Sequence, residues 1–393
     1  MTIRITDEQR RWRLAHRHRL LVSGRTDDVA TITDDLVALH SSDPATVYLS
    51  CLVRMVDPSI ERVEAALYDQ RLVVRHHAMR RTIWVMTPEV ARLAHATATA
   101  KIAAAERKRT VKALATTDID DPEAWFTAGQ REVIGLLAAE GQLGTREIGR
   151  RLPHLVVPVR FGSGANIATL NAHTKMLQGS GFDADLVRTR PNGTWMSSEY
   201  AWSATETWLG HAIAGLETRP AAAELVDRYL RRFGPCTETD LRWWFGETAT
   251  LVRNALADSG AVEVELDDGA TAWVAAGDDI EVPDPGPCVR LLPGLDSTAM
   301  GWKERDWYVD PTYEPRLFDR FGNIGPTIWA DGRVVGGWVQ RPDGSIVLDR
   351  LEPLSAEHEA LLNDAVQELE AVLGDVAVKP RFPSRNQKDL LPG

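Results

Sequence analysis

One short polar turn holds the side chains of this sequence that are best suited to chemistry. Residues 39–50 read LHSSDPATVYLS and place four polar residues between two expected helices: His40, Ser41, Ser42 and Asp43. Each residue also has a structural interpretation. Asp43 and Ser42 are typical helix N-caps, and a proline directly follows Asp43. His40 at the end of a helix would stabilise the negative end of its dipole.

Motifs for other common sites do not occur in the sequence. It contains no Walker A motif, no Rossmann fingerprint and no H-E-x-x-H. The three cysteines, Cys51, Cys236 and Cys288, lie far apart, which gives neither a disulfide framework nor a zinc-binding spacing. We therefore expect no metal and no cofactor.

Helices followed by a two-stranded hairpin are predicted three times, and this is the element order of a winged helix. In the first unit, helices over residues 33–40, 44–55 and 59–68 precede strands at 71–75 and 82–86. The second and third units end in hairpins at Asn192-Gly193 and Asp268-Gly269, both strong turn signals. The winged helix is a common DNA-binding design, so DNA is the expected partner.

The expected fold class is α+β, with three tandem winged-helix units followed by a C-terminal β-barrel-like domain. We place an N-terminal helix and the first unit at 1–115, the second at 116–218, the third at 219–282 and the barrel-like domain at 283–393. The first helix, at 5–21, has a basic face that is either solvated or turned toward phosphates. Residues 382–393 are expected to be a loose tail.

Charge is distributed unevenly along the chain. The 393 residues have a formal net charge of −11, which by itself argues against nucleic-acid binding. Residues 1–160, however, hold 24 Lys/Arg against 20 Asp/Glu, whereas residues 161–393 hold 21 against 36. This division predicts a positive DNA-binding face on an acidic body. With no 18-residue apolar run and no secretory signal pattern, we expect a cytoplasmic, nucleoid-associated monomer without a membrane partner.

Five stretches spread over most of the chain carry a family resemblance. They are LHSSDPATVYLSCLVRM, RRTIWVMTPE, LRWWFG, LLPGLDSTAMGWKERDWYV and FGNIGPTIWADGRVVGGWV. Together they resemble the AlkZ/YcaQ-like family of winged-helix DNA glycosylases. The resemblance implies tandem winged helices, a C-terminal β-barrel, and cleavage of the N-glycosidic bond of bulky or cationic alkylated purines in double-stranded DNA. Antibiotic adducts and crosslinks are among such lesions.

The resemblance also implies roles for the polar turn. The family's catalytic motif is Gln, an apolar residue, then Gln or Asp, and by position it falls on His40 and Ser42, where this sequence departs from it. In this scheme His40 takes a proton from the attacking water, Ser42 orients that water, and Asp43 stabilises the cationic sugar. A cationic N7-alkylguanine leaves without a general acid, so little further catalysis is required.

DNA contacts are expected to be mostly electrostatic, from the wings and the barrel hairpin. The candidates are Arg75, His77, Arg80, Arg81, Arg188, Arg190, Lys303, Arg305, Asp331, Gly332 and Arg333. The last three lie in the hairpin that, by resemblance, approaches the minor groove. Trp302 and Trp307 are candidates for stacking on DNA, with packing in the core as the alternative.

The sequence thus predicts a monofunctional DNA glycosylase. An alternative is a winged-helix DNA-binding protein without catalysis, either a regulator or a lesion-binding shield. Another is a protein-interaction scaffold of degenerate winged helices. Release of free modified base separates the first possibility from the second, and a lack of salt-dependent DNA binding would single out the third.

Overall fold

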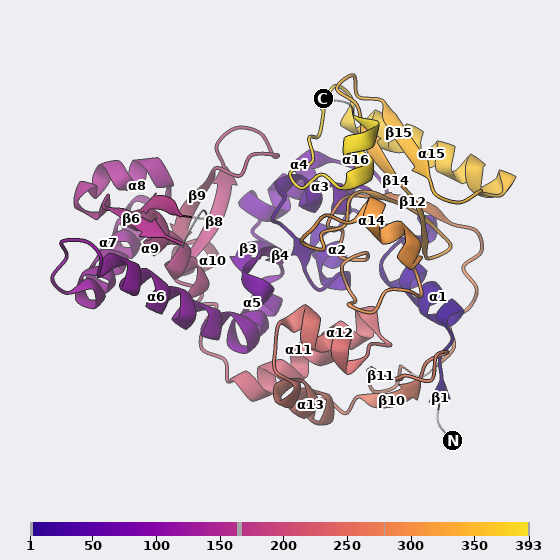
Figure 1. The fold of residues 1–393 in the computed structure, drawn as a ribbon, viewed down its shortest axis with the longest axis horizontal. Coiled ribbons are helices and arrows are strands. Elements are labelled where there is room, and N and C mark those ends of the chain that lie inside the picture. The colour runs from indigo at the N-terminus through magenta and orange to yellow at the C-terminus, as the bar shows by residue number, and fades with distance from the viewer. Residues whose placement is uncertain (1–2, 163–166, 279, 392–393) are drawn as a thin grey trace.

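The protein has a mixed α and β fold with one large core and a projecting second unit. The computed structural model describes residues 3–162, 167–278 and 280–391. In Figure 1 the region around residues 100–200 lies to one side, while the earlier and later parts of the chain pack together on the other. One large apolar cluster joins the first unit, the third unit and the C-terminal sheet, whereas most of the second unit has its own cluster.

The helices of the first unit begin at side chains that cap them, and the cap at Asp43 confirms the prediction. Helices α1 (Asp7–Arg17), α3 (Pro44–Leu52) and α4 (Ile60–Glu64) are capped by Thr6, Asp43 and Ser59. Strands β3 (Val74–His77) and β4 (Ile83–Met86) form the hairpin, and α5 (Pro88–Ala94) follows.

The prediction of a helix over residues 33–40 is wrong for the second half of that range. α2 (Val29–Asp35) ends early, and β2 (Leu39–His40) pairs with β4. Val37 has a left-handed backbone with φ 58°, which is incompatible with a continuing helix. Pairing with β4 then satisfies backbone groups that the helix would have used. His40 therefore stands at the end of a strand, so the helix-dipole interpretation does not apply to it.

The second unit shares a sheet with the first. Its helices are α6 (Ala100–Leu114), α7 (Pro122–Glu140), α8 (Thr145–Arg151) and α9 (Ala172–Phe182). Its strands β8 (Leu186–Pro191) and β9 (Tyr200–Ala204) pair, β5 (Gln142–Gly144) adds to β9, and β6 (Pro158–Phe161) pairs with β7 (Ala168–Asn171). One antiparallel pair, Arg75 with Arg188, joins β3 to β8 in the order β2-β4-β3-β8-β9-β5. The first two hairpins are therefore not separate wings.

The third unit repeats the order of helices and hairpin. It consists of α11 (Thr218–Phe233), α12 (Glu238–Phe245), α13 (Ala249–Asp258), β10 (Val262–Glu265) and β11 (Thr271–Val274). Thr237 caps the start of α12 and forms a capping box with Asp240. β1 (Ile3–Arg4) adds a parallel strand to β10.

The C-terminal region is an open sheet with a covering helix. Strands β12 (Val289–Leu292), β13 (Thr327–Ala330), β14 (Arg333–Gln340) and β15 (Ile346–Arg350) pair antiparallel in chain order, and α15 (Ala356–Leu373) packs against β12. Within the described residues β12 and β15 do not pair with each other, so the expected barrel does not close. The loose tail is also wrong, because α16 (Arg385–Leu390) docks against β14.

The basic face of α1 is neither solvated nor turned outward as expected. Arg13 and Arg17 bind Asp278 at 3.1 and 2.6 Å, and Arg10 stacks on Trp307 at 4.0 Å. These arginines fasten α1 to segments late in the chain. No helix in the described part of the chain is long and apolar enough to cross a membrane.

Candidate active site

The polar turn lies between β2 and α3, and its main chain is held on both sides. The Asp43 carboxylate Oδ1 accepts the Ala45 N–H at 3.1 Å, so Asp43 is the helix N-cap as predicted. The Ser41 N–H donates to the Ile83 carbonyl at 2.8 Å, which continues the pairing with β4. The four side chains are consequently placed by a strand and a helix, not by a flexible loop.

His40 is buried and electrically neutral. Its ring packs edge-on against Trp84 with centroids 4.7 Å apart, and only 4% of the residue is exposed. Burial, together with the positive charge of Arg80, lowers the pKa of His40 to about 3. Its Nδ1 accepts the Ser42 N–H at 3.4 Å, which puts the ring proton on Nε2. A lowered pKa makes the imidazole a weaker proton acceptor, so its expected role as the base for water stays a prediction.

Ser41 is hydrogen-bonded to Arg75, a buried arginine that we expected to be exposed on the first wing. Arg75 Nε donates to Ser41 Oγ at 2.8 Å, and Arg75 Nη1 donates to the Tyr68 hydroxyl at 2.7 Å. The guanidinium also lies 4.4 Å from the centre of the Tyr200 ring. With 2% of Arg75 exposed, its expected exposure on the first wing is wrong. The strand that carries Arg75, β3, is paired with β8, and the Arg75 guanidinium faces hydroxyl groups and aromatic rings.

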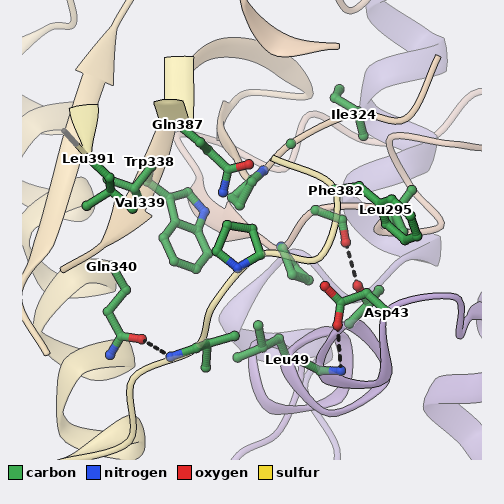
Figure 2. A pocket seen from close by; sticks show the side chains of 18 residues that line it. Asp43, Leu49, Leu295, Ile324, Trp338, Val339, Gln340, Phe382, Gln387 and Leu391 are labelled. Atoms are coloured by element: carbon green, nitrogen blue, oxygen red, sulfur yellow. Dashed lines mark hydrogen bonds between the residues drawn. The ribbon is translucent and has the colours of Figure 1, made fainter. Parts of the chain in front are cut away.

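Asp43 borders a pocket between α3, the C-terminal sheet and the end of the chain. The pocket is small, with a cavity volume of about 50 Å³, and Figure 2 shows the Asp43 carboxylate in a lining of apolar side chains that include Leu49, Leu295, Ile324 and Trp338. The second carboxylate oxygen, Oδ2, accepts the Arg381 N–H at 3.1 Å. Burial raises the pKa of Asp43, and its two N–H donors and the charge of Arg381 oppose that rise.

Three arginines around the turn have no carboxylate partner within the described residues: Arg75, Arg80 and Arg188. Arg80 stacks on Trp243 at 4.1 Å, and Arg188 stacks on Trp202 at 4.9 Å. Burial lowers the pKa of both Arg80 and Arg188 to about 10, so both remain cationic at neutral pH. In a chain of net charge −11, this group is a local excess of positive charge.

Comparison with known proteins identifies the family. A model of the AlkZ-like DNA glycosylase family matches residues 33–372. The chain belongs to the AlkZ-like DNA glycosylases. Its fold is also similar to that of Streptomyces sahachiroi DNA glycosylase AlkZ, with a TM-score of 0.72 at 19% sequence identity, over 93% of this chain and 96% of that one. Comparison with curated protein sequences gives no significant match. Membership implies DNA as substrate and a role in DNA repair.

The other expected DNA contacts of this AlkZ-like chain fall into two groups. Some are occupied by carboxylates: Arg81 by Glu106 at 3.6 Å, Arg190 by Glu64 at 2.7 Å, Arg333 by Glu352 at 3.5 Å and Arg305 by Glu314 at 3.9 Å. Lys303 is exposed and has no ion pair within the described residues. Apart from the buried Arg75, the expected cations without a carboxylate partner within the described residues are therefore Arg80, Arg188 and Lys303.

Two of the expected contacts are enclosed by the fold. His77 is 3% exposed and lies 4.5 Å from the Phe182 ring, so its expected exposure on a wing is wrong. Gly332 is buried against Arg11 of α1, and the neighbouring Asp331 carboxylate binds His358 at 2.7 Å. The β13–β14 turn is therefore packed onto the body, and a direct DNA contact by Gly332 would require α1 to move.

The structure also exposes an aromatic residue that sequence reasoning missed. Trp302 and Trp307 are buried, as the core-packing alternative proposes. Phe321 is instead 74% exposed, at the tip of a turn in which Asp319 Oδ1 accepts the N–H groups of Phe321 and Asn323. The Asp-x-x-Gly-Asn pattern of this turn was a usable signal, since such side chains fix tight turns.

Proposed function

We propose that this AlkZ-like chain is a monofunctional glycosylase that hydrolyses the N-glycosidic bond of bulky alkylated purines. N7-alkylguanine lesions, including antibiotic adducts and crosslinks, are the proposed substrates. The observation that carries the proposal is the Asp43 carboxylate at the end of the family's catalytic turn, whose other residues Ser41 and His40 lie near Arg75 and Arg80, arginines without carboxylate partners within the described residues. A negative charge suits a cationic sugar, and the positive group suits the DNA backbone around it.

The proposed mechanism assigns less to His40 than the sequence suggested. A cationic base departs with the bonding electrons and needs no proton, so the sugar becomes oxocarbenium-like. Asp43 stabilises that positive charge and accepts the proton that the attacking water loses as its oxygen bonds to the sugar carbon, and the half-buried Ser42 hydroxyl orients that water. His40 Nε2–H is a hydrogen-bond donor, and Arg75 holds the turn in place through Ser41.

The proposed binding surface combines charge with one stacking residue. The three helix-and-hairpin units, with the boundaries given above, are proposed to act as tandem winged helices. Arg80, Arg188 and Lys303 are proposed to bind phosphates, and Phe321 to stack on an exposed base, since aromatic stacking tolerates any sequence. The apolar wall of the Asp43 pocket is proposed to contact the alkyl substituent of the lesion.

The test is release of free base from damaged duplexes. Purified protein is incubated with DNA that contains N7-methylguanine or a bulkier N7 adduct, and released base and alkali-labile abasic sites are measured together. We expect release from damaged DNA only, with binding of undamaged DNA that weakens steeply with salt. An absence of released base from every adduct would contradict the proposed activity.

A non-catalytic DNA-binding protein is the second candidate. It is favoured by the low pKa of the buried His40 and by the departure of His40 and Ser42 from the family's catalytic motif. This candidate predicts tight binding of adducted DNA without base release. The same incubation, analysed for bound DNA as well as free base, separates the two functions.

A further inference from the structure

The end of the chain is fastened to the body. We call residues 376–391 the tail. The Gln340 side chain makes two hydrogen bonds to the tail. Its Nε2 donates to the Val376 carbonyl at 3.0 Å, and its Oε1 accepts the Val378 N–H at 2.8 Å. Figure 2 shows the second of these bonds at the edge of the Asp43 pocket. Further along, three polar residues of the tail are almost completely buried: Ser384, Asn386 and Gln387.

Two glycines of the body leave room for side chains of the tail. A Cβ atom at Gly325 would overlap Ser384 Oγ, and one at Gly337 would overlap Asn386 Nδ2. Neither glycine has a positive φ, so backbone conformation does not require glycine there. The absence of a side chain at these two positions therefore serves the docking of the tail.

The docked tail brings Arg381 to the catalytic turn. Its N–H donates to Asp43 Oδ2, on the opposite side of the carboxylate from the Ala45 N–H. Its side chain is exposed, and the guanidinium makes no hydrogen bond or ion pair within the described residues. Its charge also acts on Arg188, whose pKa it lowers further after burial and the charge of Arg75. Arg381 thus adds an exposed positive charge beside the catalytic turn.

We propose that the tail is a working part of the active site, in which the Arg381 main chain positions Asp43 and the Arg381 guanidinium binds a DNA phosphate beside the lesion. The inference rests on the proposed function for the role of Asp43. The phosphate contact does not depend on catalysis and can be measured separately.

The local charges predict how Arg381 acts on Asp43. Asp43 is the only ionisable side chain among the described residues that line the pocket. Arg381 is the one charged side chain that acts on its pKa, and it acts to lower it. The pocket side of Asp43 is otherwise apolar, and its own turn contributes the neutral His40. Loss of the Arg381 charge should therefore raise the pKa of Asp43.

The first experiment removes the charge and leaves the main chain intact. Arg381→Gln is compared with Arg385→Gln, which makes the same change elsewhere in the tail, where the side chain lies 3.9 Å from Asp389. Binding of a duplex carrying N7-methylguanine is measured over a salt series, and base release over a pH series. For Arg381→Gln we expect the slope of log affinity against log salt to fall by about 1, which makes binding about tenfold weaker at 0.1 M salt. The acid limb of base release should move to higher pH.

The second experiment displaces the tail from the body. Gly325→Ala should undock it, and Ser384→Gly in the same chain should restore the space and the docking. Limited proteolysis reports docking, and single-turnover base release reports the active site. We expect Gly325→Ala to make the tail protease-sensitive and slow base release at least tenfold, with both effects reversed in the double variant.

The outcomes distinguish this inference from the proposed function. Equal salt slopes and pH profiles for Arg381→Gln and Arg385→Gln would overturn it, and so would faster base release after undocking, which would make the tail inhibitory. If the parent protein releases no base, the proposed function fails. A reduced salt slope in Arg381→Gln alone would still support the phosphate contact, and an unchanged slope would overturn it.

Discussion

Replacement of Asp43 by Asn separates its structural role from its chemical role. As N-cap, Asp43 accepts the Ala45 N–H, and Asn caps a helix about as well as Asp does. The amide would however turn its NH2 group toward the Arg381 N–H, which now donates to a carboxylate oxygen. The loss of that bond should cost about 1 kcal/mol of unfolding free energy. In a chain of this size, that corresponds to a decrease in melting temperature of roughly 2 °C.

The expected effect on base release is much larger. A carboxylate beside a developing positive charge in a partly buried site contributes about 3–4 kcal/mol to transition-state stabilisation. Its loss should slow release by about 10²–10³-fold. The assay is single-turnover release of N7-methylguanine from a duplex, with thermal unfolding measured on the same preparations.

A matched control is available in the second unit. Asp121 caps α7 and, like Asp43, precedes a proline at the first helical position. Asp121→Asn should leave base release unchanged, with at most a small loss of stability. If Asp43→Asn released base within about threefold of the parent protein, Asp43 would be only a helix cap, and the reasoning that assigns it to chemistry would be refuted.

Four further outcomes follow from burial and charge. Because the pKa of His40 is about 3, the rate of base release should not change with pH around 6.5. A change of rate near pH 6.5 that disappears in His40→Ala would contradict the claim that His40 is already neutral there. Burial also lowers the pKa of His76 to about 3 in the folded protein. As the pH falls below 6.5, His76 is therefore protonated in the unfolded chain but not in the folded one, which favours unfolding. Stability should then drop by about 1 kcal/mol per pH unit from this residue, and urea unfolding of His76→Leu at pH 7 and 5.5 should show a smaller drop than the parent. Arg54 and Asp296 form a fully buried pair at 2.8 Å, so Arg54→Met should cost about 3–5 kcal/mol in urea unfolding, with partial recovery when Asp296→Leu is added. Phe321→Ala should weaken DNA binding by about 1–3 kcal/mol and leave the salt slope unchanged, whereas an unchanged affinity would exclude stacking.

Local signals in the sequence predicted local structure well. Asp43 and Ser59 begin helices where their capping side chains indicate, and the capping box at Thr237 is present. Such signals act over three or four residues, so they are readable without knowledge of the fold. The turn with the polar cluster was also found, because its residues are consecutive. The family resemblance is confirmed by the match over residues 33–372.

Only the tertiary structure decided how those residues are placed. Whether Arg75 reaches solvent depends on β8, more than a hundred residues away, and the pKa of His40 depends on its enclosure by Trp84 and other neighbours. The contact between Asp43 and Arg381 joins residues that are 338 positions apart. Burial and charge pairing are properties of a side chain's neighbours. Residue type and spacing indicate which groups can do chemistry, and long-range packing determines which are exposed, charged and free to act.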